Sequence, residues 1–551
     1  MPVPAALVPL RHQVFRALWT ANLVTSLGLW MQNTGAGWLM TTLSPDALSV
    51  SLVQAATIVP TFLLALPAGA LADIVDRRRY LIASQTWTMV AAVVLAALTY
   101  AHMIDASGLI MLTFAIGVGS AMYQPAWGAT VPEIVPRQDL VQAIALNGIG
   151  FNIARAIGPA IGGILVLFGG PSLAFLLYAL SFAVGISILL RWRRTTARSS
   201  LPREHFVAAM RAGAQFVRHN PAMQAAMIRA IAFFLPSAAT WALLPLVVRE
   251  QLGLGAGSFG LLLGLMGVGG VTAGMLLPRL RAFASRGTTV FGASLVSGAG
   301  MTLMAATHHW APAALGMLLF GTGWVTAAST TQAAAQLVAP AWVRARALAI
   351  YQLAFNAALA AGTLLWGTIG NLVSLQHSMG LAAIAAVALA FLVRGYSLDE
   401  ALPVATPPPA PPMPEAPDPL ILATLPRSRG RILETMRYHV VPSDLEVFLA
   451  AMTQVQHVRG RAGALDWHLY EDVAHPEEWL ETWSMLDWSD HLREAVRLSD
   501  DDKQVLARVA PFHDSAAPLP CRFLRVEPGL KRPAPERPDL ERPSLSSRNA
   551  A

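Results

Sequence analysis

The chain has 551 residues, of which 55% are hydrophobic and 13% charged, and its mean hydropathy is +0.51. Soluble domains carry about twice that share of charged residues, so the composition excludes an ordinary soluble protein. Residues 1–396 hold 22 Arg, no Lys and 8 acidic residues, whereas residues 397–551 carry a net charge of −7. The basic excess needs no nucleic-acid partner, because cytoplasmic loops of membrane proteins collect arginine.

Twelve apolar stretches follow one another along the basic region, each long enough to cross about 30 Å of hydrocarbon as a helix. The predicted spans are 15–40, 48–75, 80–101, 108–131, 140–168, 172–191, 222–248, 257–280, 288–307, 312–336, 343–370 and 378–395. Basic connections, such as 76–79, alternate with connections nearly free of arginine, and Arg249 is the single exception. We therefore expect a multi-pass protein of the cell membrane, with both termini and the central loop 192–221 in the cytoplasm.

The two halves of this region repeat each other. Phe151-Asn152 returns as Phe355-Asn356, at an offset of 204 residues. The same offset maps Gly117, Gly119, Pro136, Gly158 and Gly163 onto Gly321, Gly323, Pro340, Gly362 and Gly367. The repeat predicts two six-helix halves, 1–191 and 222–396, with a substrate path at their interface near the membrane midplane.

Arg155 lies in the middle of the predicted span 140–168, and its counterpart in the repeat is Leu359. A charged side chain at bilayer depth costs at least about 2.5 kcal/mol, so it persists mainly where it faces water or a partner. We expect Arg155 to line the path and to recognise an anionic group, together with Asn152, which lies three residues earlier on the same helix face. The alternative is a structural hydrogen bond from Arg155 to carbonyl groups of a facing helix.

Polar and aromatic residues recur at helical spacing on the first and fourth spans and less regularly on the tenth. They are Asn22, Ser26, Trp30 and Asn33 on the first, Ser120, Gln124 and Trp127 on the fourth, and Trp324, Thr331 and Gln332 on the tenth. Asn22, Ser26 and Gln124 are candidates for contact with the substrate, although polar side chains in membrane helices often only hold neighbouring helices together. No Asp, Glu or Lys lies centrally in a predicted span, so proton coupling would use Asp73 or Glu133 at the cytoplasmic rim, or protons released with the substrate.

Two motifs resemble a known family. Gly69-Ala-Leu-Ala-Asp73, followed by Asp76-Arg-Arg-Arg79, resembles the loop 2–3 signature of the major facilitator superfamily, but that loop usually has a basic residue and a glycine where this chain has Ile74 and Asp76. Gly158-Pro-Ala-Ile-Gly-Gly163 resembles the glycine-proline motif in the fifth helix of its exporters. Three further stretches, 22–32, 151–159 and 343–347, are similar to the enterobactin-exporter-like branch, the transmembrane secretion effectors. The resemblance implies a twelve-helix secondary transporter without enzymatic activity, cofactor or metal.

The resemblance also implies a role for the loop motif. Gly69 would let two helices approach closely, and Asp73 would cap the eleventh helix, which opens near Val343. Arg77 and Arg78 would pair with Glu133 or Asp139 in a latch that forms in one conformational state and breaks in the other. In the alternative, the arginines only set the orientation of the protein by contacting anionic lipid.

The glycine-proline motif has two expected effects. Gly158 and Pro159 would bend the fifth helix, and Gly162 and Gly163 would let it pack closely on a neighbour. The resemblance to exporters favours a bend that takes part in transport. A bend needed only for packing is the alternative.

The acidic tail is predicted to contain a Pro- and Ala-rich linker, 397–430, a folded domain, 431–528, and a disordered end, 529–551. The domain shows the order βαββαβ, which favours a ferredoxin-like α+β sandwich and is similar to dimeric barrel domains of the antibiotic-biosynthesis monooxygenase type. Candidates for a pocket there are His491, Trp467, Trp479, Trp483 and Trp488. In the alternative the aromatic residues are core, and one histidine without a paired acid or metal makes no active site. Ligand sensing or self-association is the expected use of the domain, and the lone Cys521 excludes an intrachain disulfide.

Two functions are therefore predicted. The first is a secondary transporter that exports a small organic molecule, such as a siderophore, drug or secondary metabolite, by alternating access. The alternative is a membrane-anchored sensor or bifunctional protein that acts through its C-terminal α+β domain. The repeat and the loop motif favour transport.

Overall fold

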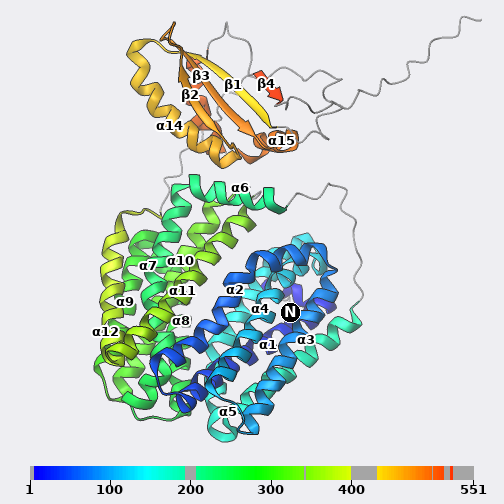
Figure 1. The fold of residues 1–551 in the computed structure, drawn as a ribbon, viewed down its shortest axis with the longest axis vertical. Coiled ribbons are helices and arrows are strands. Elements are labelled where there is room, and N and C mark those ends of the chain that lie inside the picture. Colours follow the sequence, from blue (N-terminus) through cyan, green and yellow to red (C-terminus); the bar gives the residue numbers. More distant parts are fainter. Residues whose placement is uncertain are drawn as a thin grey trace, which may run out of the picture. The chain divides into compact units, whose positions relative to one another are not determined.

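The computed structural model describes residues 5–192, 206–340, 343–398, 431–498, 500–513 and 521–524 (Figure 1). The chain divides into two compact units. The first comprises Met1–Phe206, Ala222–Ala339 and Arg344–Glu400, and the second comprises Val207–Pro221, Pro340–Val343 and Ala401–Ala551. The predicted linker from residue 399 onwards and the predicted end 529–551 lie outside the described residues.

Apolar runs of the first unit form long helices. They are α1 (Gln13–Leu43), α2 (Ala47–Ile74), α3 (Arg77–Tyr100), α4 (Ala106–Ile134), α5 (Leu140–Arg191), α7 (Pro221–Leu246), α8 (Ala256–Phe283), α9 (Arg286–Ala306), α10 (Trp310–Val338), α11 (Arg344–Leu372) and α12 (Leu375–Leu392). The side chains of Asp46, Asp76 and Asp105 cap α2, α3 and α4, because each accepts the backbone N–H of the residue three positions later. Within the described residues, 10 helices are long and apolar enough to cross a membrane.

Helix α5 covers both the fifth and the sixth predicted spans in 52 residues. Gly170 interrupts it in a left-handed conformation, with φ of +73°. The sequence predicts a break at this place, and Pro171 cannot donate the hydrogen bond that would continue the helix. The 10 membrane-crossing candidates count this stretch once and do not include α1, so the number twelve stays a prediction.

The internal repeat reappears in how glycines pack. A Cβ on Gly158 of α5 would lie 2.6 Å from Cβ of Trp30 on α1. A Cβ on Gly362 of α11 would collide with the backbone oxygen of Leu235 on α7. Helix α5 therefore packs on α1 as α11 packs on α7, which agrees with the register of the repeat.

The two halves meet through another glycine pair of the repeat. A Cβ on Gly163 of α5 would lie 2.7 Å from Cα of Gly260 on α8, and a Cβ on Gly367 of α11 would collide with the side chain of Ser51 on α2. Each contact joins a helix of one half to a helix of the other. Small residues permit this close approach, so the interface between the halves includes α5 with α8 and α2 with α11.

The second unit contains a four-stranded antiparallel sheet in the order β2-β3-β1-β4. Its elements are β1 (Ile432–His439), α14 (Leu445–Ala462), β2 (Trp467–Glu471), β3 (Glu478–Met485), α15 (Trp488–Arg497), α16 (Asp500–Val509) and β4 (Cys521–Leu524). The chain order is the predicted βαββαβ order, with the second helix divided into α15 and α16. A small C-terminal α+β domain is thus confirmed.

The central segment between the halves contains helix α6 (Phe206–His219), which is grouped with the second unit. Nε2 of Gln215 donates to the backbone oxygen of Ala464 at 3.5 Å. The ring centroids of His219 and His457 are 6.4 Å apart, and a Cβ on Gly460 would lie 2.7 Å from Cγ of His219. Helix α6 therefore packs on α14, at a position where glycine leaves room for an imidazole ring.

Candidate functional site

A pocket of about 240 Å³ lies between the two halves of the first unit. Its lining includes Asn152, Arg155 and Pro159 of α5, Trp241 of α7, Met266, Gly270 and Gly274 of α8, and Trp324, Val325 and Ser329 of α10. Helix α5 belongs to the first half and the other three belong to the second. The pocket therefore lies at the kind of interface where the repeat predicts the substrate path.

Arg155 and Asn152 form the polar side of this pocket. Nη2 of Arg155 donates to Oδ1 of Asn152 at 2.9 Å, and Nδ2 of Asn152 donates to the backbone oxygen of Gly148 at 2.9 Å. Within the described residues no carboxylate forms an ion pair with Arg155. Asn152 thus orients a guanidinium group that presents its remaining N–H donors to the pocket.

Tryptophans form the aromatic side. The rings of Trp241 and Trp324 have centroids 5.6 Å apart, and Trp30 lies 5.8 Å from Trp241. The Nε1 atoms of Trp30 and Trp241 are buried without a hydrogen-bond partner in the described part of the chain. An indole N–H only donates, and a buried donor without a partner is costly. Of these two residues only Trp241 lines the pocket, and its N–H favours a ligand that carries acceptor atoms.

Trp241, Ser329 and the glycines of α8 line the pocket but were not predicted from the sequence. A tryptophan in the middle of an apolar span is the signal that could have found Trp241, because its N–H needs a partner. Gly267, Gly270 and Gly274 recur at i, i+3 and i+7, which is the spacing of one helix face. Such a stripe is common at helix contacts, so it gives no sign of a cavity by itself.

The remaining predicted pathway residues lie outside the lining of this pocket. Asn22 accepts a hydrogen bond from Oη of Tyr123 at 3.1 Å, which ties α1 to α4. Ser26 is partly buried and Gln124 is exposed. The structure brings Arg155 and Asn152 together in one site and does not bring Asn22, Ser26 or Gln124 to it, so their part in transport stays a prediction.

The loop motif provides an ion pair at the start of α3. Nη1 of Arg77 lies 2.5 Å from Oε1 of Glu133, near the end of α4. Asp139, the other predicted partner, lies 2.9 Å from Nε2 of His12. The surroundings of Gly69 and the side chain of Asp73 lie outside the described residues. The Arg77–Glu133 pair has the geometry of the predicted latch, and its dependence on conformational state stays a prediction.

Arg78 has a structural contact that the sequence did not indicate. Its Nε and Nη2 donate to the backbone oxygens of Leu189 and Leu190 at 2.7 and 2.6 Å. These carbonyl groups belong to the last turn of α5, where they lack partners within the helix. Arg78 thus caps α5, in addition to any effect on orientation.

The glycine-proline motif of α5 serves close packing. A Cβ on Gly162 would lie 2.9 Å from Cα of Met31, so Gly162 joins Gly158 in the contact with α1. Gly163 faces α8 instead. The only non-helical backbone angles recorded within α5 are those of Gly170, and the bend at Gly158 and Pro159 stays a prediction.

Arg249 joins the two halves at the end of α7. Its Nη1 donates to the hydroxyl groups of Thr41 and Thr42 at 3.0 and 2.7 Å. Its guanidinium carbon lies 5.9 Å from the ring of Trp38, and that ring stacks on Phe259 at 6.0 Å. The one arginine that departs from the charge pattern of the connections is therefore a bridge between the first and the seventh helices.

The tail residues predicted to line a pocket mostly pack in the core of the α+β domain. Trp483 and Trp488 belong to one buried cluster, with Trp467 against it, and Trp479 packs against a second cluster. The expectation that His491 lacks an acidic partner is wrong, because its Nδ1 lies 2.5 Å from Oε1 of Glu434. Glu434 lies on β1, far away in the sequence, and only the folded sheet brings it to α15.

Comparison with known proteins gives a consistent result. A family model described as transmembrane secretion effector matches residues 4–527. The staphyloferrin A transporter of Staphylococcus aureus is 24% identical over 263 residues, which cover 48% of this chain and 66% of that protein. The multidrug efflux pump Tap of Mycolicibacterium fortuitum is 25% identical over 279 residues, covering 49% of this chain and 67% of the pump. The chain thus spans about two thirds of the length of these relatives.

Solved structures agree on the fold. A bacterial homologue of the human lysosomal transporter Spinster, in an inward-facing conformation, aligns with a TM-score of 0.56 at 14% identity, covering 71% of this chain and 98% of that one. The nucleoside transporter NupG aligns with a TM-score of 0.57 at 12% identity, covering 70% of this chain and 99% of that one. At such identities the likeness concerns the fold alone.

Proposed function

The chain belongs to the transmembrane secretion effector family of major facilitator transporters, and we propose that it is a secondary exporter of a small organic anion. The observation that carries this proposal is the position of Arg155 in a pocket between the halves, without a carboxylate partner among the described residues. A guanidinium group keeps its charge at any physiological pH. It therefore needs water or an anion on its open side.

The rest of the pocket supports the same substrate class. Arg155, Asn152 and Trp241 offer N–H donors, whereas Trp241 and Trp324 offer flat apolar faces. A ligand that combines a carboxylate or similar group with an apolar or aromatic body would match both the N–H donors and the apolar ring faces. The names of two relatives, a staphyloferrin A transporter and a multidrug efflux pump, agree with a small-molecule cargo and with export.

Twelve membrane crossings follow if α5 is counted as two helices, separated at Gly170, and α1 is added to the 10 candidates. The N-terminal and C-terminal ends of this region then lie on one side of the membrane. The basic connections, among them 76–79, support a cytoplasmic position for that side.

Alternating access requires the halves to separate at one end of the unit and to close at the other. Arg249, bonded to Thr41 and Thr42, and the Gly163–Gly260 contact join the halves at the end where α7 is followed by α8. We infer that these contacts break during transport. No pocket-lining residue described here is a carboxylate or imidazole, so a coupling proton would travel on Glu133 or Asp73 at the rim, or on the substrate.

The test is uptake into inverted membrane vesicles of paired compounds that differ only at one acidic group. Each pair consists of a carboxylic acid and its methyl ester, with apolar bodies of different size. We expect the acids to be transported and to compete with each other for transport. The esters should be neither transported nor able to compete with the acids. Equal transport of acid and ester, at equal membrane abundance of the protein, would overturn the anionic substrate class while leaving transport itself intact.

A further inference from the structure

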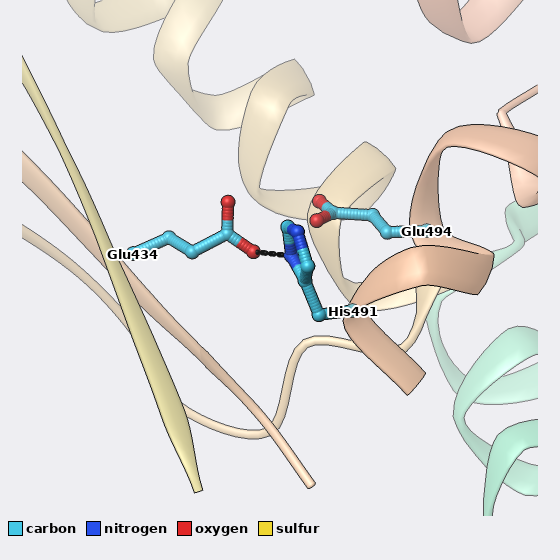
Figure 2. Close-up of side chains that lie close together, drawn as sticks. All are labelled: Glu434, His491 and Glu494. Carbon is cyan, nitrogen blue, oxygen red and sulfur yellow. Dashed lines mark hydrogen bonds and ion pairs between the residues drawn. The ribbon is translucent and has the colours of Figure 1, made fainter. Parts of the chain in front are cut away.

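Three side chains of metal-ligand type lie together inside the α+β domain. Glu434 comes from β1, and His491 and Glu494 come from α15 (Figure 2). Their exposed fractions are 4%, 8% and 6%. Carboxylates are almost never buried to this extent unless a partner compensates their charge.

The backbone explains how the three side chains meet. His491 and Glu494 are three residues apart on α15, so they share one face of the helix. Glu434 lies on the central strand β1 and approaches from the sheet, so that the imidazole ring stands between the two carboxylates in Figure 2. One ligand atom from each residue lies within 4.8 Å of the other two. Donors held at about 2.1 Å from one ion are about 3 to 4 Å apart, so small rotations of the side chains would bring all three to it.

The charges around the cluster leave two carboxylates short of compensation. Glu481 is fully buried and accepts hydrogen bonds from Nε of Arg459 at 3.1 Å, from Oη of Tyr438 at 2.7 Å and from Nε1 of Trp467 at 3.0 Å. The positive charge of Arg459 and the negative charge of Glu481 therefore compensate each other. Arg459 reaches Glu494 with a second hydrogen bond of 3.1 Å, but its single charge serves both acids.

The other nearby cation lies at the edge of the cluster. Arg522 is 3.9 Å from Glu434, and its side chain is 23% exposed, compared with 5% for Glu434. With a neutral imidazole and both carboxylates ionised, as metal ligands are, Glu434 and Glu494 together carry a charge of −2. A divalent cation would bring that sum to zero.

We propose that Glu434, His491 and Glu494 bind one divalent transition-metal ion in the C-terminal domain. One imidazole and two carboxylates suit Zn²⁺, Fe²⁺ or Mn²⁺, whereas a site for Mg²⁺ or Ca²⁺ would be built from oxygen ligands alone. Arg459 holds Glu494 in place and lies 3.6 Å above the ring of Trp483, so the ligand carboxylate has an ordered outer partner. The site is separate from the transport pocket and does not depend on the proposed substrate.

The experiment uses the purified full chain in detergent, with any affinity tag removed and bound metal stripped by a chelator. Zn²⁺ and Mn²⁺ are titrated separately, and the metal that remains after desalting is counted by mass spectrometry. We expect one equivalent of metal with micromolar or tighter affinity. X-ray absorption of the zinc form should show nitrogen and oxygen ligands, and no sulfur, at about 2.0 to 2.2 Å.

Two variants and two controls make the test specific. Glu494→Gln preserves shape and its hydrogen-bonding side chain, and His491→Asn removes the nitrogen ligand; each should weaken binding by at least about tenfold, a loss typical even for outer partners of a metal. His475→Ala and Glu477→Gln, which alter exposed groups of the same domain, should bind as the wild type does. If His491→Asn does not fold, the metal affinity of Glu494→Gln alone tests the proposal. Absence of a retained equivalent in the wild type, or unchanged binding in Glu494→Gln, would overturn the proposal and leave the trio as a purely internal ion network.

Discussion

Gly163 of α5 and Gly260 of α8 stand so close that neither can carry a side chain without meeting the backbone of the other. A Cβ on either residue would lie 2.7 Å from Cα of its partner. Real Cβ atoms essentially never approach another heavy atom so closely. This contact fixes the distance between the halves at one end of the membrane unit.

Replacement of Gly163 by valine should keep the halves apart at this end. We expect Gly163→Val to insert normally and to reduce the initial rate of transport at least about tenfold, because one state of the alternating cycle needs the close approach. Gly148→Ala is the matched control, since it alters the same helix at a position with no atom within 4 Å. Wild-type transport by a well-expressed Gly163→Val variant would show that the contact is not needed in any state.

In Arg155→Leu, the arginine of the first half is replaced by the residue type that occupies the equivalent position in the second half. The variant should lose transport of acidic compounds by at least about a hundredfold, because an anion in the pocket would then have no countercharge. Arg155→Lys should keep part of the transport of acidic compounds, because lysine retains the positive charge. It should not keep all of it, because the planar pair of N–H donors is lost. Arg281→Leu, an exposed position near the end of α8, serves as the control for removal of a positive charge. Equal rates for Arg155→Leu and the wild type would mean that the charge is structural.

Arg249→Gln should loosen the end where the halves meet, because two hydrogen bonds to α1 and the contact with Trp38 are lost. Spin labels at Pro45→Cys and Gly255→Cys, in a chain with Cys521→Ser, report the distance between the α1–α2 and α7–α8 connections. We expect Arg249→Gln to shift this distance distribution towards longer values. An unchanged distribution would show that the glycine contacts alone hold this end closed.

The Arg77–Glu133 pair should matter more for transport than for stability. Both side chains are about one quarter exposed, 24% and 27%, and such pairs contribute at most about 1 kcal/mol to folding. We expect Arg77→Glu and Glu133→Arg each to reduce transport at least about fivefold, and the double exchange to recover more than the product of the two losses. Arg79→Glu controls for a charge change in the same motif. Without such recovery, the two residues act independently and form no latch.

Glu494 should make the stability of the α+β domain depend on pH. Burial raises the pKa of Glu494 to about 7, the charge of Glu434 acts in the same direction, and Arg459 opposes it. The unfolded value is about 4.3. Between these values the native domain binds more protons than the unfolded chain, so the contribution of Glu494 is present below about pH 4 and is lost as the pH rises through about 7.

Glu494→Gln cannot ionise, so its domain should gain stability relative to the wild type as the pH rises from about 5 to about 8. The measurement is pulse proteolysis of the full chain in urea, with metal chelated, following the C-terminal domain. Glu477→Gln, at an exposed position, should parallel the wild type. Parallel curves for Glu494→Gln and the wild type would contradict the raised pKa.

The membrane fold was predictable because its signals are local. Apolar runs predicted the helices, and the Gly169-Gly170-Pro171 stretch predicted the break in α5. The repeat offset predicted equivalent packing positions such as Gly158 and Gly362. Arg155 was predictable for the same reason, since a charge in an apolar span needs a cavity or a partner.

The contacts that escaped prediction join residues far apart in the chain. Arg249 appeared only as an exception to a charge rule, and its partners Thr41 and Thr42 lie in the other half of the protein. Glu434 and His491 are 57 residues apart, and strand register decides whether they meet. A single sequence carries no information on such pairings unless the fold is known beforehand.

Helix α6 belongs both to the connection between the membrane halves and to the packing of the C-terminal domain. The two halves are joined covalently through residues 192–220, and α6 occupies the last part of this segment while it packs on α14. The C-terminal domain therefore contacts part of the segment that joins the two halves along the chain.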